Sequence, residues 1–142
     1  MKINLFKLLA NGVISLSFII LFICFVWLIY PYNPATFREL PHTVEPKVIQ
    51  GGNFIVVNID VCKNIHIPPE ISRAFVDGVI YQIPTYTTVD DETGCRVRKV
   101  QIYVPKGLPI GKYFISSNFK FQVNPIRTIE FQTRTEQFEV IE

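Results

Sequence analysis

The chain has 142 residues, which is enough for one domain and a membrane anchor but not for two full hydrophobic cores. Its formal net charge is +2 at pH 7, and Lys2 and Lys7 near the N-terminus account for the whole excess. The part that follows Tyr30 is therefore neutral. Because nucleic-acid binding requires a basic face, we exclude nucleic acid as a partner.

Residues 13–30, VISLSFIILFICFVWLIY, contain no charged side chain. A helix of this length covers about 27 Å, close to the roughly 30 Å hydrocarbon core of a bilayer. A cleaved signal peptide has a shorter apolar region and small residues at the cleavage site, whereas this run ends in bulky side chains. A lipoprotein signal requires a small residue before its cysteine, and here Ile23 precedes Cys24. We therefore expect residues 1–30 to form a cytoplasmic stub and a retained transmembrane helix, a signal-anchor.

The basic residues indicate the orientation of this helix. Lys2 and Lys7 precede the apolar run, and the first basic residue after it is Arg38. Positive charge stays on the cytoplasmic side, so the N-terminus is expected in the cytoplasm. The C-terminal domain would then lie in the periplasm, or an equivalent extracytoplasmic space, of an inner (cytoplasmic) membrane. The sequence has no Asn-x-Ser/Thr acceptor, which favours a bacterial setting.

Cys62 and Cys95 are the only cysteines in the exported part, because Cys24 lies in the apolar run. An oxidising compartment permits a disulfide between them, and two unlinked thiols are the alternative. A zinc site needs more ligands than two cysteines and two distant histidines. We predict a disulfide, no metal site and no cofactor.

Residues 31–46 contain four prolines, a density that excludes a helix. We expect a proline-rich, semi-stiff stalk there, with His42 solvated.

Residues 47–142 show the two-residue alternation of apolar and polar side chains that is typical of strands. The pattern is clear in residues 53–62 and returns in residues 95–104. Residues 72–83 contain Asp77-Gly78 between two apolar runs, which predicts a hairpin; the alternative is one strand with a bulge at Gly78. Residues 65–70 are expected to form a loop because of their paired prolines.

Residues 85–94 are expected to form a polar connection. The run Asp90-Asp91-Glu92 lacks the spaced ligands of a calcium loop, so we interpret it as a solvated turn. The basic residues that follow at positions 96, 98 and 99 are expected to neutralise this turn. A patch for anionic lipid or a partner is the alternative.

Residues 108–123, LPIGKYFISSNFKFQV, contain the clearest core strand. Gly111 and Tyr113 follow a Leu-Pro turn and resemble the tyrosine corner of immunoglobulin-like sandwiches, in which the tyrosine bonds back to the preceding turn. Gly111 would supply permissive backbone angles. The resemblance implies an all-β, immunoglobulin-like Greek-key sandwich of about seven strands. The chain departs from antibody domains, because no Trp follows Cys62 and Ile115 occupies the place of the second cysteine.

The C-terminal residues 124–127 are expected to form a tight turn before a final strand that starts near Ile129. Phe138 and Val140 lie on the opposite parity, which predicts a bulge near Thr135. One N-terminal helix followed by a small sandwich with an Asn-Pro-x-Arg hairpin also resembles small uncharacterised phage or prophage membrane proteins.

The residue inventory contains no nucleophile motif, phosphate loop or metal-ligand cluster, so we predict no enzyme activity. The leading hypothesis is a single-pass protein whose exported sandwich binds a partner protein of the envelope or membrane. No small-molecule substrate is expected. The candidate partner contacts are loop and turn residues: Ile65, His66, Asp77, Gly78, Asn124 and Arg127.

Two alternatives remain open. One is a phage-encoded envelope factor that acts in holin-like lysis control or in superinfection exclusion. The other is a structural subunit of a membrane machine.

Overall fold

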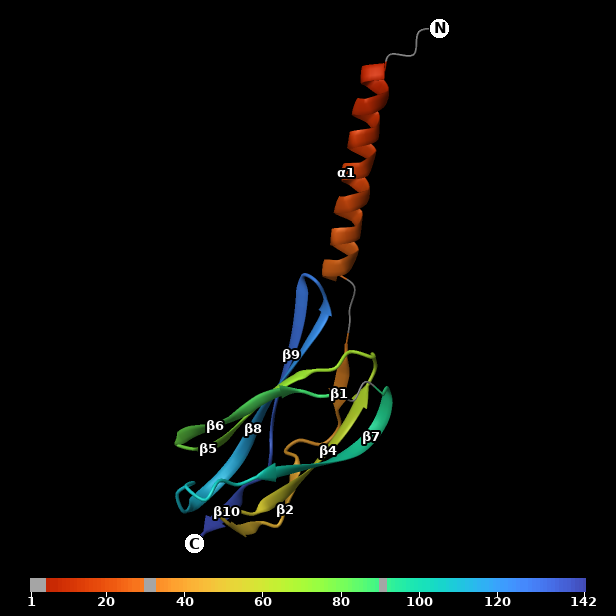
Figure 1. Ribbon diagram of the computed structural model, residues 1–142. Helices are drawn as coiled ribbons and strands as arrows, with labels where there is room; N and C mark the ends of the chain where they lie inside the picture. The colour runs from red at the N-terminus through yellow and green to blue at the C-terminus, as the bar shows by residue number, and fades with distance from the viewer. Residues whose placement is uncertain (1–4, 30–32, 90–91) are drawn as a thin grey trace. The chain divides into compact units, whose positions relative to one another are not determined.

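The computed structural model describes residues 5–29, 33–89 and 92–142 (Figure 1). The chain divides into two compact units. One contains the N-terminal helix and residues 124–127, and the other contains residues 33–123 and 128–142. Asp90 and Asp91, in the predicted acidic turn, lie outside the described residues.

The helix α1 (Leu5–Ile29) contains a stretch from Leu9 to Leu28 with a mean hydropathy of 2.5. This stretch is long and apolar enough to cross a membrane, although a signal sequence passes the same test. Its large apolar side chains are exposed on every face. The Ser17 hydroxyl donates to the Val13 carbonyl at 3.0 Å, so this polar group is satisfied inside the helix. The described helix therefore presents an apolar surface all round.

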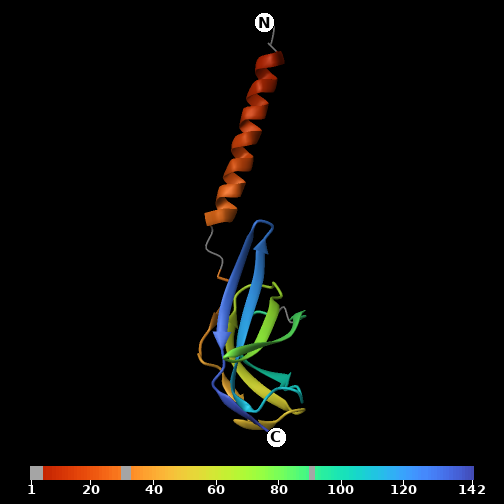
Figure 2. The same cartoon turned by 90° about the vertical axis from the view of Figure 1, so that its left-hand side faces the viewer.

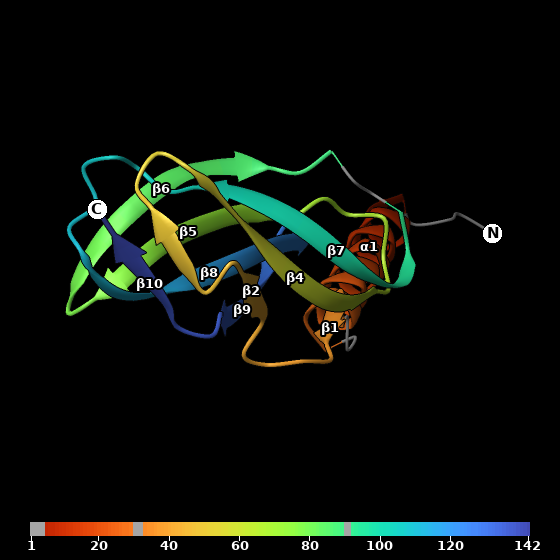
Figure 3. The same cartoon turned by 90° about the horizontal axis from the view of Figure 1, so that it is seen from below.

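The remaining described residues form ten strands in two open sheets. In the first sheet β4 (Phe54–Lys63) is central (Figure 3). The strand β7 (Gly94–Tyr103) pairs antiparallel with the whole length of β4. The short strands β1 (Ala35–Phe37) and β2 (Thr43–Glu45) pair with successive parts of β4.

The second sheet has the order β3-β10-β8-β5-β6, and β9 also pairs with β8. The long strand β8 lies beside β9 in Figures 1 and 2. The strand β10 pairs parallel with β3 and antiparallel with β8. The bounds of these strands are β3 (Val48–Gln50), β5 (Glu70–Asp77), β6 (Val79–Thr87), β8 (Gly111–Asn124), β9 (Arg127–Arg134) and β10 (Phe138–Ile141).

We call residues 33–123 and 128–142 the β domain. Its two sheets share one hydrophobic core, so the domain has two layers. Alternate residues of β4 point inward, from Ile55 to Val61, as the sequence pattern predicts. They meet large side chains of the second sheet, including Phe75 and Tyr113. Phe37 and Phe119, one from each sheet, have ring centroids 4.9 Å apart. Aromatic pairs of this kind stabilise beyond the area that they bury.

The structure corrects the predicted stalk. Residues 35–37 and 43–45 form β1 and β2, so much of the proline-rich segment belongs to the first sheet. Ala35 and Val44 are buried, and His42, which we expected in solvent, is only 1% exposed. Three-residue strands are too short to show a period in sequence, and their pairing with β4 holds them in place.

Two further boundaries differ from the sequence expectation. The strand β6 continues to Thr87, so it takes in residues that we assigned to a polar connection, and β5 already begins at Glu70. The predicted parity change near the C-terminus is present, but it lies between two strands. Thr133 and Thr135 are buried on one parity and Phe138 and Val140 on the other, with Glu136 and Gln137 outside both strands.

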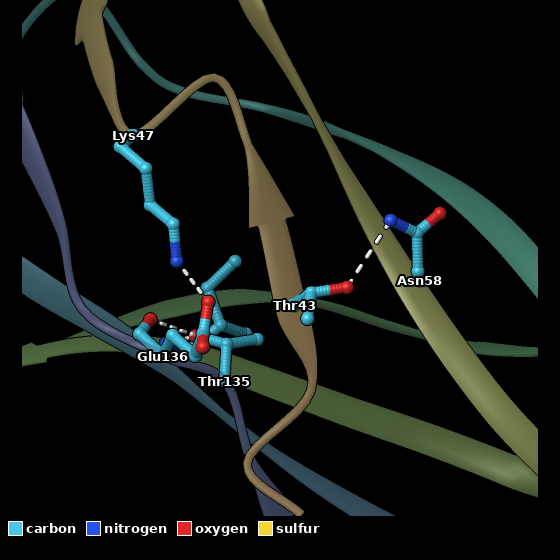
Figure 4. Close-up of polar contacts among 6 residues, drawn as sticks. Thr43, Lys47, Asn58, Thr135 and Glu136 are labelled. Atoms are coloured by element: carbon cyan, nitrogen blue, oxygen red, sulfur yellow. Dashed lines mark hydrogen bonds and ion pairs between the residues drawn. The ribbon is translucent and has the colours of Figure 1, made fainter. Parts of the chain in front are cut away.

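Thr135 fixes this break. Its backbone nitrogen donates to the Ile115 carbonyl at 3.0 Å, and its hydroxyl accepts from the Ile115 nitrogen at 2.9 Å. The side chain thus replaces a strand partner for β8. Beside it an ion pair joins Lys47 and Glu136, and the Asn58 amide donates to the Thr43 hydroxyl at 3.2 Å (Figure 4). The ion pair is exposed, so its contribution to stability is small.

Tyr113 is buried at the start of β8, and its hydroxyl donates to the Pro109 carbonyl at 2.9 Å. This is the bond that a tyrosine corner requires. Burial raises the pKa of Tyr113, and Tyr81 and Asp77 add to the rise. Gly111 does not adopt a positive φ, contrary to the expectation of permissive angles. A Cβ at Gly111 would lie 2.7 Å from a carboxylate oxygen of Asp77, so a larger residue here would require the Asp77 side chain to move.

The predicted disulfide between Cys62 and Cys95 is present, and it joins residues that face each other across β4 and β7. The two cysteines are 33 positions apart in sequence. A cross-link over such a loop restricts the unfolded chain more than the folded one.

We expect the double variant Cys62→Ala/Cys95→Ala to lower the free energy of unfolding of the β domain by about 3–4 kcal/mol. Pulse proteolysis of the full chain in urea would measure the change. The wild-type chain under reducing conditions should match the double variant, and Cys24→Ala should match the oxidised wild type. An unchanged urea midpoint in the double variant would contradict this role of the disulfide.

Candidate functional site

The six predicted contact residues lie on three separate connections. Ile65 and His66 lie between β4 and β5, and Asp77 and Gly78 lie at the β5–β6 turn. Asn124 and Arg127 flank the β8–β9 turn and belong to the other compact unit. Within the β domain, Ile65 and His66 thus lie on a different connection from Asp77 and Gly78.

The β5–β6 turn is a hairpin, as the Asp-Gly pair predicts, and not one bulged strand. Asp77 pairs with Val79, and Gly78 has a φ of +67°, which favours glycine. In the other predicted turn, the Asn124 side-chain oxygen accepts from the Ile126 nitrogen at 3.0 Å. These contacts account for the local conformation of both turns.

The strand β6 forms an edge of the second sheet. It pairs with β5, and no second strand pairs with it among the described residues. Its first half, VIYQI, has no charged residue and no proline. The side chains of Val79 and Ile80 are 57% and 62% exposed. Edge strands are usually protected by charge, proline or a bulge, and in β6 only the second half contains a proline, Pro84.

The strand β7 lies at an edge of the first sheet and, unlike the first half of β6, contains basic residues. Arg96, Arg98 and Lys99 are placed along it, and Arg96 forms an ion pair with Glu92 at 2.5 Å. This pair agrees with the expectation that the basic residues neutralise the acidic turn. Among the described residues, no group of three potential metal ligands is found.

A pocket with a cavity volume of about 100 Å³ lies between the two sheets. Its apolar wall comes from both layers and includes Phe37, Ile59, Ile71, Phe119 and Phe121. The basic side chains of Lys63, Arg73 and Arg98 also line it, and none of its described lining residues is acidic. Lys63 and Arg98 each have a further interaction partner.

Arg73 is the most unusual lining residue. It lies on β5 with only 5% exposure, and its neighbours of the same parity, Ile71 and Phe75, are buried core residues. Its guanidinium donates a hydrogen bond to the Tyr86 hydroxyl and lies 5.2 Å from the centroid of the Tyr86 ring. A buried cation normally requires a carboxylate or a set of strong acceptors. The Tyr86 contacts supply one neutral acceptor and a cation–π interaction.

His42 lies buried near this wall, with its ring 5.8 Å from that of Phe37. Neither ring nitrogen has a hydrogen-bond partner in the part of the chain that the structure describes. Burial lowers the pKa of His42 below its usual 6.5; the nearby backbone of Glu39 opposes the shift, and the charge of Arg73 adds to it. His42 is therefore neutral in the folded protein at neutral pH.

The sequence predicts the turns, but it does not predict the pocket. The signal for Arg73 was present, because a two-residue period through Ile71 and Phe75 places it on the core face. The other walls come from strands far apart in sequence, which no local pattern brings together.

No family model matches the sequence, and no curated protein matches it. Among solved structures, the chain is similar to a Niemann-Pick type C2 protein from the Japanese carpenter ant, with 14% identity and a TM-score of 0.51. The match covers 78% of this chain and 96% of that protein, and it shows a shared fold alone.

A second match is the Pseudomonas fluorescens alkylpurine DNA glycosylase AlkC bound to DNA containing an abasic site analog. It has 9% identity and a TM-score of 0.42, and it covers 76% of this chain but 30% of that protein. No inference is based on this match.

We expect the β domain to lose stability as the pH falls below 6.5, because the unfolded chain protonates His42 at that pH while the folded chain keeps it neutral. Above pH 6.5 this contribution should be constant. Thermal unfolding of the full chain at pH 8.0, 6.5 and 5.0 would measure the loss, with His66→Gln as the background.

In that background His42→Leu should reduce the loss at acid pH and keep or raise the stability at pH 8.0, since it removes an unsatisfied polar group. An identical acid-induced loss with and without His42 would contradict the assignment.

Proposed function

We propose that this chain is a single-pass, membrane-anchored binding protein. Its β domain is proposed to be an immunoglobulin-like sandwich outside the cytoplasm that binds another protein of the envelope. The apolar surface of α1 and the charge difference across it support the anchor. The two open sheets on a common core and the Tyr113–Pro109 hydrogen bond support the immunoglobulin-like architecture. The sequence-based alternatives, a phage-encoded factor or a machine subunit, stay predictions.

The observation that supports protein binding is the unprotected first half of β6. A free strand edge presents backbone N–H and C=O groups that can pair with an extended segment of another chain. Residues 79–83 have no charge or proline to prevent this, and Val79 and Ile80 are exposed. The hairpin turn at Asp77 and Gly78 lies at the start of this edge. The proposed partner therefore adds a strand to β6.

The anchor has a direct test. We expect the chain purified from bacterial membranes to retain residues 1–30, and to remain in the membrane after extraction at alkaline pH. Protease added to spheroplasts should digest the β domain. Intact mass and immunoblotting would measure both results. A mass that lacks the N-terminal residues would indicate a cleaved signal peptide, and a protected β domain would contradict the orientation.

The edge has a separate test. A photo-reactive amino acid at Ile80 is expected to cross-link one envelope protein in cells. When Val79→Lys is introduced into the same chain, the cross-linked product should disappear, because a charge on an edge strand prevents strand addition. Mass spectrometry of the cross-linked peptide should locate an extended segment of the partner. Hydrogen exchange should show that the amides of residues 79–83 become protected in the complex.

Val89 offers a matched control, since it is also apolar and is 97% exposed but lies outside β6. The photo-reactive group at Val89 should give no such product, and Val89→Lys should leave the Ile80 product unchanged. Equal products from both positions, or none from Ile80, would contradict the edge as the binding surface.

A further inference from the structure

The pocket between the sheets has the composition of a ligand site. Aromatic and branched aliphatic side chains form its wall, and a charged side chain that is 95% buried reaches it from β5: the relative exposure of Arg73 is 5%. Ligand pockets in proteins are mostly apolar with a few well-placed polar groups that orient the ligand.

We propose that this pocket binds a small amphiphile with one narrow apolar tail and an anionic head group that Arg73 holds. The proposal concerns a site separate from the β6 edge and does not depend on protein binding there.

The volume limits the apolar part of the ligand. A cavity of roughly 150 Å³ with an aliphatic and aromatic lining takes up one benzene molecule. The cavity here is about 100 Å³, smaller than one that holds a benzene ring, so it accommodates a single short alkyl chain and neither a ring nor a fused-ring lipid. The wall residues Ile59 and Phe119 come from different sheets, so a ligand between them would contact both layers.

The charge of the lining determines the head group. Arg73 is a buried cation, and none of the described residues that line the pocket is acidic, so the local potential at its guanidinium favours an anion. The guanidinium of Arg73 uses one N–H for the Tyr86 hydroxyl. It has no carboxylate partner in the described parts of the chain. Its remaining donors suit the two oxygens of a carboxylate or phosphate, which arginine binds in a bidentate fashion.

The ligand would also complete the solvation of Arg73. Water and the Tyr86 hydroxyl are neutral acceptors, whereas an anionic head group in a low-dielectric site interacts more strongly with a guanidinium. Tyr86 accepts a hydrogen bond from the cation, and its ring centroid lies 5.2 Å away, so this one side chain keeps the guanidinium oriented. The apolar tail and the charged head are thus recognised by two neighbouring parts of one pocket.

The test uses the full chain in zwitterionic nanodiscs with ¹³C-labelled isoleucine methyl groups. Ile59 and Ile71 line the pocket, whereas Ile49 is buried elsewhere in the core and serves as the internal reference. Butanoate should shift the methyl signals of Ile59 and Ile71 in a saturable manner and leave Ile49 unchanged. Butanol should bind at least about tenfold more weakly, since it lacks the charge-assisted bond, and butyltrimethylammonium should not bind. Butyl phosphate, run in parallel, distinguishes the two anionic head groups by which one binds more tightly.

Two variants test the recognition of the head group and of the tail separately, and a third variant is a control. Arg73→Met should remove the preference, so that butanoate and butanol bind equally. Arg134→Met, at an exposed arginine outside this pocket, should keep the preference. Ala35→Leu, which fills the cavity and retains Arg73, should abolish binding of both amphiphiles. Dispersed methyl signals from each variant show that it is folded.

A lack of response at Ile59 and Ile71 in the wild-type chain would overturn the site. Equal affinities of butanol and butanoate in the wild type would overturn the role of Arg73. Both results leave the cross-link at Ile80 unaffected, so the two proposals fail independently.

Discussion

The β domain depends on the inward face of β4. This strand pairs along both edges, with β7 on one side and with β1 and β2 on the other. Its alternate side chains point into the core. A shift of its register by one residue would expose Ile55 to Val61 and bury the polar side chains between them. The disulfide between Cys62 and Cys95 joins β4 to β7 at one end and opposes such a shift. The second sheet then packs on the face of β4 whose inward-pointing side chains are fixed by this register.

Most of the long strands could be predicted from the sequence, because a strand with one buried face repeats every two residues. This is why β4, β7 and β8, and the hairpin at Asp77 and Gly78, were located correctly. The short strands β1 and β2 could not be predicted, because three residues do not define a period and the surrounding prolines indicate irregular backbone. His42 was misplaced for the same reason. The break at Thr135 was expected from parity, but its cause, a side-chain hydroxyl that pairs with the Ile115 backbone, depends on a tertiary contact.

The candidate surfaces differ in how far local sequence describes them. The β6 edge is defined by two features. The absence of charge and proline over residues 79–83 is visible in the sequence, whereas the position of β6 at the end of a sheet is not. The pocket needs the packing of two sheets. Most of its lining comes from β1, β4, β5, β6, β7 and β8, and the sequence separation of these strands hides the juxtaposition. Arg73 and Lys63 leave a local signal, because each is a cation at a core position of an otherwise apolar strand face.

The cost of keeping that cation supports a functional explanation over a structural one. A buried charge with a single neutral acceptor destabilises a fold, and apolar side chains of similar volume in such positions are often neutral or stabilising. If Arg73 served only packing, a methionine would fill the same space without the desolvation penalty. The neighbouring His42 adds an unsatisfied polar side chain to the same region of the core. Proteins accept local instability of this kind mainly at sites that bind or react, so the region around Arg73 is where a ligand-dependent gain in stability is expected.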